Sequence, residues 1–279
     1  MTNNAKFMAH SVSHSGGWLP MIPLTKAVVP GDFGQLRGGS LAPLGNIQDL
    51  RLVQPVDASE PLALADNWCW SSGVIPQYRG SSSETQSAVG EANYRGWQKQ
   101  ALGFDGPGSF AFHGRAPQGQ WLLNWAEFAP DITLKLTQSA FSFREVVVVT
   151  AVAEVSQWGL AIAGGADAEL VLISEDSSDW GGLSHQSAQL AQSRGLTQAA
   201  LGCDQRGYFF KAKKLVLSAL KHDQLLQQLL QQANPPTGAQ LSHWLSAGLI
   251  NRVQAQELNL TTCLDTFDWA DVTLADLHL

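Results

Sequence analysis

The chain has 279 residues, 44% of them hydrophobic, which is enough to bury the core of one large domain or of one domain with a small appendage. Its formal net charge is -7, from 24 acidic and 17 basic residues. This balance argues against nucleic acid as a partner and against constitutive binding to an anionic membrane, because clustered positive charge supplies much of the affinity in both cases.

The cysteines and the N-terminus bear on location. Cys69, Cys203 and Cys263 are far apart and have no metal-ligand spacing, so we expect free thiols in a reducing, cytoplasmic compartment. We expect no signal peptide, because residues 1–17 contain no apolar segment, and no transmembrane helix, because no run reaches roughly 18 apolar residues. Residues 1–17 are polar and are predicted to form a flexible N-terminus.

The main predicted domain spans residues 18–233 and begins with extended segments. Three prolines between residues 20 and 30 exclude a long helix there. Turn clusters at 30–34 and 38–39 predict a short strand at 33–37 and its return at 41–44.

Residues 52–100 have the least regular pattern of the domain. The stretch 80–93 is rich in Gly, Ser, Glu and Gln, and a long polar connection of this kind predicts a mobile segment. Residues 100–114 then predict two strands around a turn at 105–108. The aromatic residues of these strands are Phe104, Phe110 and Phe112.

The stretch 141–174 is the predicted centre of an antiparallel sheet. Its four consecutive valines favour a strand, because β-branched side chains pack well on a pleated surface. Trp158–Ala163 and Ala168–Ser174 predict a second and a third strand, joined by a glycine-rich turn. We therefore expect residues 144–174 to form adjacent antiparallel strands, with Val147, Val149 and Val155 on one buried face.

The region beyond Ser174 changes in character. A weakly amphipathic helix is predicted around 183–191, a strand at 207–217, and a leucine-rich helix that runs to about residue 233. The strand carries a basic cluster, Lys211, Lys213 and Lys214. Two interpretations of this cluster remain open: a solvated strand surface, or a site for an anion or a lipid headgroup.

A boundary at 234–238, Asn-Pro-Pro-Thr-Gly, precedes a C-terminal appendage. Residues 235–279 are predicted to be helical and acidic, with an apolar stripe that must pack against a neighbouring surface. The stripe consists of Leu241, Trp244, Leu245, Leu249 and Ile250.

No catalytic motif stands out. The chain has no GxSxG elbow, no HExxH, no Walker loop and no GxGxxG. His113 with Asp105 or Glu127 is conceivable as an acid–base pair, but ordinary polar roles are favoured, and Cys69 is interpreted as a small buried hydrophobe. We expect neither an enzyme nor a cofactor nor a metal site.

Four segments in this order resemble the amino-terminal pore-forming domain of gasdermins, and more closely the short gasdermin-like proteins of fungi and bacteria. The segments are Pro30–Gly34 with Leu44–Asn46, Gly103–Phe112, Val146–Glu154 and Gly207–Ala212. The VVT-x-V sequence within the third is shared most visibly. The resemblance covers about residues 19–217.

The resemblance implies an α+β fold, with a twisted, mainly antiparallel sheet, peripheral helices and the helical appendage. It implies a latent pore-forming protein, a cell-death or defence effector, that on activation forms a homo-oligomer and inserts β-hairpins into membrane lipid. Carried over by position, the hairpins lie at about 93–114 and 146–173. Their candidate membrane residues are Phe104, Phe110, Phe112, Val147, Val149, Val155 and Trp158.

The resemblance also assigns two further roles. Lys211, Lys213 and Lys214 become candidates for lipid contact. The family's large inhibitory domain has no counterpart in this chain, so Leu241, Trp244, Leu245, Leu249 and Ile250 of the appendage become the autoinhibitory candidates.

Two other classes of function remain open. The chain could be a non-catalytic binding or assembly module of a prokaryotic multiprotein complex, with some of its ten tryptophans at the contact surface. An enzyme of unrecognised type is the third. Membrane leakage separates the first hypothesis from both others.

Overall fold

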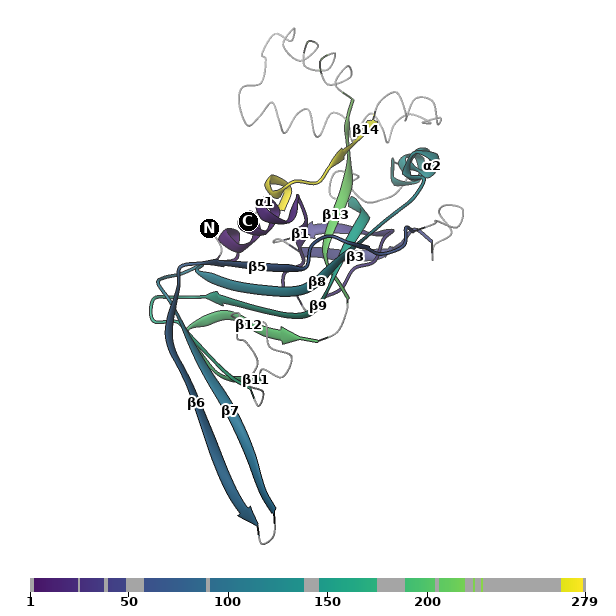
Figure 1. The fold of residues 1–279 in the computed structure, drawn as a ribbon. Coiled ribbons are helices and arrows are strands. Elements are labelled where there is room, and N and C mark those ends of the chain that lie inside the picture. Colours follow the sequence, from purple (N-terminus) through teal and green to yellow (C-terminus); the bar gives the residue numbers. More distant parts are fainter. Residues whose placement is uncertain are drawn as a thin grey trace.

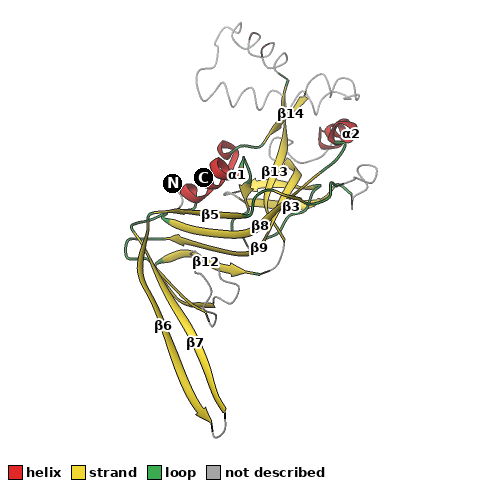
Figure 2. Ribbon diagram, in the orientation of Figure 1, coloured by secondary structure: helices red, strands yellow, loops and turns green. Residues whose placement is uncertain are grey.

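A computed structural model shows an α+β fold of mainly antiparallel strands with two α-helices, as the sequence predicts (Figures 1 and 2). The structure describes residues 3–24, 26–37, 40–48, 58–88, 91–137, 146–174, 189–203, 206–218, 223, 227 and 267–277, and all structural statements concern these residues. In chain order the elements are α1 (Ala5–Ser15), β1 (Leu19–Pro20), β2 (Asp32–Arg37), β3 (Ser40–Asn46), β4 (Leu62–Ala63), β5 (Asn67–Ser72), β6 (Val74–Ala88), β7 (Glu91–Phe104), β8 (Phe110–Trp121), α2 (Trp125–Thr137), β9 (Val146–Ala163), β10 (Glu169–Ser174), β11 (Gln189–Arg194), β12 (Leu196–Gly202), β13 (Arg206–Leu217), β14 (Phe267–Asp271) and the 3-10 helix η1 (Leu274–Leu277).

Strand β9 is the centre of a ten-stranded sheet. Its first half pairs with β2 and β13, and its second half pairs with β8 and β12. Val147 and Val149 pack into one core, whereas Val146 and Val148 pack into another on the opposite face. A strand that is buried on both faces has no need of a polar alternation, which explains the four consecutive valines.

One bulge lets β9 continue to Ala163 instead of turning at Trp158. Gln157 adopts φ 48, and the register with β8 shifts at this point. Because one extra residue reverses the side-chain alternation, Val155 and Trp158 face the same core. The prediction of a three-strand meander is therefore wrong: residues 146–163 are one strand, and β10 pairs with β7 and β11 rather than with β9.

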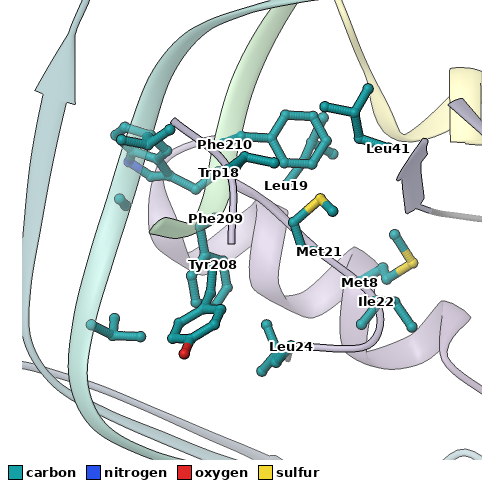
Figure 3. Close-up of a cluster of buried hydrophobic side chains, with 14 of the residues drawn as sticks. Met8, Trp18, Leu19, Met21, Ile22, Leu24, Leu41, Tyr208, Phe209 and Phe210 are labelled. Carbon is teal, nitrogen blue, oxygen red and sulfur yellow. The ribbon is translucent and has the colours of Figure 1, made fainter. Parts of the chain in front are cut away.

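The main core lies between the large sheet, α1 and the segment 18–28 (Figure 3). Met8, Trp18 and Leu19 meet the aromatic run at the start of β13. The largest fully buried side chains around them include Phe7, Phe110, Phe112, Phe209 and Phe210. This packing fixes the aromatic residues of α1, β8 and β13 in one cluster with Trp18.

The N-terminus is ordered, so the prediction of a flexible segment 1–17 is wrong for its described part. Helix α1 buries Phe7 and Met8 completely. It ends at Gly16, whose φ of 79 supplies the left-handed conformation that terminates many helices. The sequence signal was weak because only one narrow face of α1 is apolar.

A second core lies on the other face of the large sheet, under α2. It joins β2, β9, β13 and β14 to that helix, through Phe33, Ile47, Leu122, Phe128, Ile132, Val146, Val148, Leu215 and Phe267. The short β2–β3 hairpin predicted at 33–44 is confirmed and contributes Phe33 to this core.

A separate four-stranded sheet has the order β11-β10-β7-β6. It projects from the large sheet, and the β6–β7 hairpin extends furthest (Figure 1). The predictions of an irregular, mobile stretch at 52–100 and of a helix at 189–191 are therefore wrong for the described residues. These residues form β4 to β7 and part of β11.

The bulge at Gln157 generates a first prediction. Deleting Gln157 should turn Trp158, Leu160 and Ile162 away from the main core, at a cost of about 1.5–3 kcal/mol for each side chain. That sum is comparable with the whole stability of a typical domain, about 5–15 kcal/mol, so circular dichroism should show an unfolded or aggregated protein. Gln157→Gly is the control and should stay within about 1 kcal/mol, because glycine adopts positive φ freely. A folded deletion variant with an unchanged melting temperature would contradict the assignment.

Candidate functional site

Four strands of the large sheet and the four strands of the small sheet follow one another in the same order, and a bend separates the two sets. In the large sheet β5, β8, β9 and β12 are successive neighbours, and in the small sheet β6, β7, β10 and β11 are successive neighbours. Each strand of the first set is joined to the corresponding strand of the second. The small sheet is therefore a continuation of four strands of the large sheet, interrupted along one line.

The four connections at the bend are of two kinds. The outer two strands are broken by single glycines, Gly73 with φ 65 and Gly195 with φ 64. The inner two are broken by five-residue turns at 105–109 and 164–168. Both kinds contain a residue with positive φ, which glycine supplies at residues 73, 108 and 195 and Asp167 supplies in the turn 164–168.

Backbone hydrogen bonds join the connections into one row. The amide of Asp105 donates to the carbonyl of Gly73 (2.9 Å), and the amide of Gly164 donates to the carbonyl of Gly195 (2.8 Å). Between the two inner turns, Gly108 donates to Ala163, and Ala163 donates to Ser109, each at 2.8 Å. The four connections are therefore joined to one another by backbone hydrogen bonds along the bend.

Two side chains fill the space next to Gly73 at the bend. The hydroxyl of Ser109, which is buried, donates to the carboxylate of Asp105. Both groups lie where a Cβ atom at residue 73 would stand, so only glycine fits there. Asp105 is thereby used in the turn, and no contact joins it to His113 as an acid–base pair among the described residues.

The β6–β7 hairpin reaches beyond the rest of the small sheet. Residues 98–103 of β7 pair with β10, whereas residues 91–97 pair with β6 alone. We call residues 82–97 the hairpin tip. Between residues 81 and 98 the charged residues are Glu84, Glu91 and Arg95, and the register places all three on one face of the hairpin. The other face of this segment carries no charged residue.

The seven candidate membrane residues lie elsewhere. Phe110, Phe112, Val147, Val149, Val155 and Trp158 are buried in the main core, and Phe104 lies in a third core at the bend. In this structure β7 and β8 belong to different sheets and are not paired with each other, so residues 93–114 form no hairpin here. The hydrophobic signal in the sequence marked the cores and β10, whereas residues 80–93 of the β6–β7 hairpin are mostly polar and gave no such signal.

The lysine cluster on β13 is covered by the C-terminal strand. Lys213 forms an ion pair with Asp271 of β14 (2.7 Å), and Lys214 forms one with Asp276 of η1. Lys211 lies over the ring of Trp18, with 5.0 Å between its Nζ and the ring centroid. All three predicted lysines therefore have partners within the chain, and two of these partners are acidic residues of the C-terminal segment.

The two ion pairs differ in exposure. The side chain of Asp271 is 79% exposed, whereas those of Lys214 and Asp276 are 24% and 21% exposed. Burial alone would raise the pKa of Asp276, but hydrogen bonds from Lys214 and Thr273 and the charge of Lys214 outweigh it and hold the pKa below its usual value. The Lys214–Asp276 pair is therefore the stronger electrostatic link.

Apolar contacts also hold the C-terminal segment. Trp269 stacks edge-on against Trp125 of α2 (5.0 Å between centroids), and its Nε1 donates to Thr133 Oγ1 at 2.9 Å. Val272 and Leu277 are buried in the main core on the other side. The helical prediction for the appendage is wrong at 267–271, which form β14. The stripe Leu241, Trp244, Leu245, Leu249 and Ile250 lies outside the described residues.

The remaining polar candidates form no reaction centre in the described part of the chain. Cys69 is exposed rather than buried and lies opposite His113 in the β5–β8 pair. Burial, and then the charge of Arg115, lower the pKa of His113. Among the described residues, no group of three or more His, Cys, Asp or Glu side chains is placed to hold a metal ion.

No described helix has the length and apolar character needed to cross a membrane. Comparison of the chain with protein-family models and with curated proteins gave no match.

The Lys214–Asp276 pair generates a second prediction. Because folding lowers the pKa of Asp276, the stability it contributes is present above the unfolded pKa, near 3.9, and is lost as the pH falls through the folded value. Asp276→Asn should reduce the free energy of unfolding by about 1–2 kcal/mol at pH 7, and by much less at pH 3, in urea titrations. Asp271→Asn is the matched control and should change it by less than about 0.5 kcal/mol. Equal effects of the two substitutions at pH 7 would contradict the conclusion that Lys214–Asp276 is a stronger link than Lys213–Asp271.

Proposed function

We propose that this chain is a latent membrane pore-forming protein whose small sheet supplies the membrane-inserting strands. The observation that carries the proposal is the continuation of four neighbouring strands of the large sheet into a projecting sheet of the same order. The proposal moves the inserting segments from 93–114 and 146–173 to β6–β7 and β10–β11. The core residues named above then hold the body together.

The length and charge pattern of β6–β7 support this role. A strand tilted across a bilayer needs about 9–11 residues, and β6 and β7 have 15 and 14. Their charged residues between 81 and 98 share one face, so no charged residue of this eight-residue stretch of each strand has to face lipid.

The topology of the small sheet also supports assembly with further copies. The outer edges of β6 and β11 have no strand partner among the described residues. In a four-stranded antiparallel sheet the first and last strands run in opposite directions, so β11 of one copy can pair antiparallel with β6 of the next. Such a head-to-tail contact closes into a ring. Closure is required in lipid, because an unpaired strand edge leaves backbone groups unsatisfied.

The C-terminal segment fits the role of a latch on the lysines. Asp271 and Asp276 form ion pairs with Lys213 and Lys214. Without these partners the two lysines would be available for anionic headgroups. The alternative function, a non-catalytic binding or assembly module, draws on the same free edges, since an exposed edge can accept a strand from another protein. Only the pore hypothesis requires that the hairpin tip enter lipid.

The hairpin tip generates the third prediction. A protease recognition sequence placed at 234–238 allows β14 to be released, and the cleaved protein should leak dye from vesicles of phosphatidylcholine with phosphatidylserine. Replacing residues 82–97 by Asn-Gly joins Ser81 to Gln98, which are already register partners, through a two-residue hairpin turn. This variant should keep its melting temperature within a few degrees and lose the leakage.

Two outcomes would argue against the proposal. Leakage by the shortened variant would remove the hairpin tip as the inserting element. A cleaved, folded parent protein that stays inert towards vesicles of several lipid compositions would leave the binding-module alternative.

The lysines generate the fourth prediction. In the cleaved protein, Lys213→Gln with Lys214→Gln should weaken binding to the same anionic vesicles by about 1 kcal/mol per charge, and added salt should reduce the difference. Lys26→Gln, an exposed lysine outside β13, is the control and should have a smaller effect. Vesicle sedimentation measures the binding. An unchanged affinity and an unchanged salt dependence would leave these lysines with only their internal partners.

A further inference from the structure

Helix α1 lies against the bend between the two sheets. A Cβ atom at Gly108, in the turn 105–109, would stand 3.2 Å from the carbonyl oxygen of Asn3 and 3.5 Å from Cδ of Lys6. Phe110 follows this turn as the first residue of β8 and is fully buried. The start of α1 is therefore in contact with the turn 105–109, where β7 ends and β8 begins.

Two side chains of α1 hold Phe110 in place. The Phe7 ring meets the Phe110 ring edge-on at 5.4 Å between centroids, and the His10 ring meets it in the same way at 5.4 Å. The Phe7 ring also contacts Phe112, two residues further along β8, at 5.6 Å. Phe110 belongs to the main core, so these rings fix α1 to the body, while Asn3 and Lys6 contact Gly108 of the turn that must open if β7 and β8 become one strand. These contacts together stabilise the bent form.

The exposed side of this contact is a pair of stacked imidazoles. The His10 and His14 rings are 3.8 Å apart with an interplanar angle of 10°, and His14 Nδ1 lies 2.9 Å from the carbonyl oxygen of His10. Neutral rings can stack in this way, but two imidazolium rings at this distance repel each other. Burial, and then the neighbouring His14, lower the pKa of His10.

The ionisable groups on the elements around α1 either have partners of their own or point away from the histidine pair. Helix η1 carries Asp276, which binds Lys214 and Thr273, and the turn carries Asp105, which binds Ser109. Strand β1 has no ionisable residue, and on β5 the thiol of Cys69 alternates with the inward-facing Trp68 and Trp70. Lys6 on α1 itself adds positive charge. No uncommitted carboxylate in the described part of these elements is therefore available to offset charge on the histidine pair.

We propose that α1 is the clamp on the bend between the two sheets, and that protonation of His10, which lies between His14 and Phe110, loosens it. The sign follows from the lowered pKa: the docked helix binds fewer protons than the free helix, so docking is strongest above about pH 6.5 and weakens as the pH falls. Each unit of pKa difference changes the docking equilibrium about tenfold. The clamp rests on the proposed function in one respect: in that function the bend must straighten before the small sheet inserts.

Hydrogen exchange of the full chain at pH 7.5 and pH 5.5, corrected for intrinsic chemical exchange, tests the clamp directly. The amides of α1 should lose protection by several-fold and by at most about tenfold at pH 5.5, the limit for one histidine with an ordinary pKa in the free helix, while those of β9 should keep theirs. The double variant His10→Phe with His14→Gln keeps an aromatic ring against Phe110 and removes both imidazoles. Its α1 protection should differ by less than about twofold between the two pH values.

Three results would overturn the clamp: equal α1 protection at both pH values, an equal loss in β9, or the same pH response in the double variant. Leakage of phosphatidylcholine–phosphatidylserine vesicles by the protein cleaved at 234–238 separates the clamp from the pore. If α1 loosens at pH 5.5 but the vesicles stay intact, the clamp holds and the proposed pore fails. If the vesicles leak while α1 stays protected, the pore holds and the clamp fails.

Discussion

The burial of β9 on both faces is the constraint on which the rest of the structure depends. Its valines join the main core to the second core, and four other strands take their register from it. A shift of one residue would exchange the two sets of side chains, so the register of the whole large sheet is strongly determined. The bulge at Gln157 is part of this constraint, because without it the apolar residues of the second half would face away from α1 and the aromatic cluster.

The same strand leads to the bend, where the constraint is relaxed. Ala163 is the last residue of β9 and exchanges two backbone hydrogen bonds with the turn 105–109 of the neighbouring strand. Beyond this row, β6 and β7 have little to hold them except each other, since only residues 98–103 of β7 pair with β10. The molecule thus combines a body fixed by two cores with a projecting sheet that a third core joins to it, through Leu102, Phe104, Leu170 and Leu172 next to the bend. Regions with few buried apolar contacts are the ones that open at the lowest free energy, which is what a conformational change requires.

The sequence predicted those elements whose signal is local. The strands around the Asp105–Gly108 turn, the β2–β3 hairpin, the strand at 207–217 and the valine strand were all recognisable from turn residues or β-branched runs. The candidate site was largely missed for a physical reason. Apolar residues such as Phe110 and Val147 are selected by burial, so they point to the core, whereas residues 80–93 of the projecting hairpin are mostly polar and resemble a loop. The pairing of Lys214 with Asp276 joins residues 62 positions apart, and no local pattern predicts such a contact.

The magnitudes of the C-terminal contacts decide the order of events in the proposed activation. Phe267, Val272 and Leu277 are buried, and burial is worth about 1.5–3 kcal/mol for each large apolar side chain, or roughly 5–9 kcal/mol for the three before conformational entropy is subtracted. Two lysine contacts with anionic lipid offer only about 2 kcal/mol. Lipid alone therefore cannot displace β14 from β13, and the headgroups would compete for Lys213 and Lys214 only after the segment has been cut or loosened. The pKa of His10 is lowered from the ordinary histidine value and that of Asp276 from the ordinary aspartate value, so the clamp on the bend and the latch on the lysines respond to acid in separate pH ranges. Mild acidification would then free the bend while leaving the C-terminal strand in place.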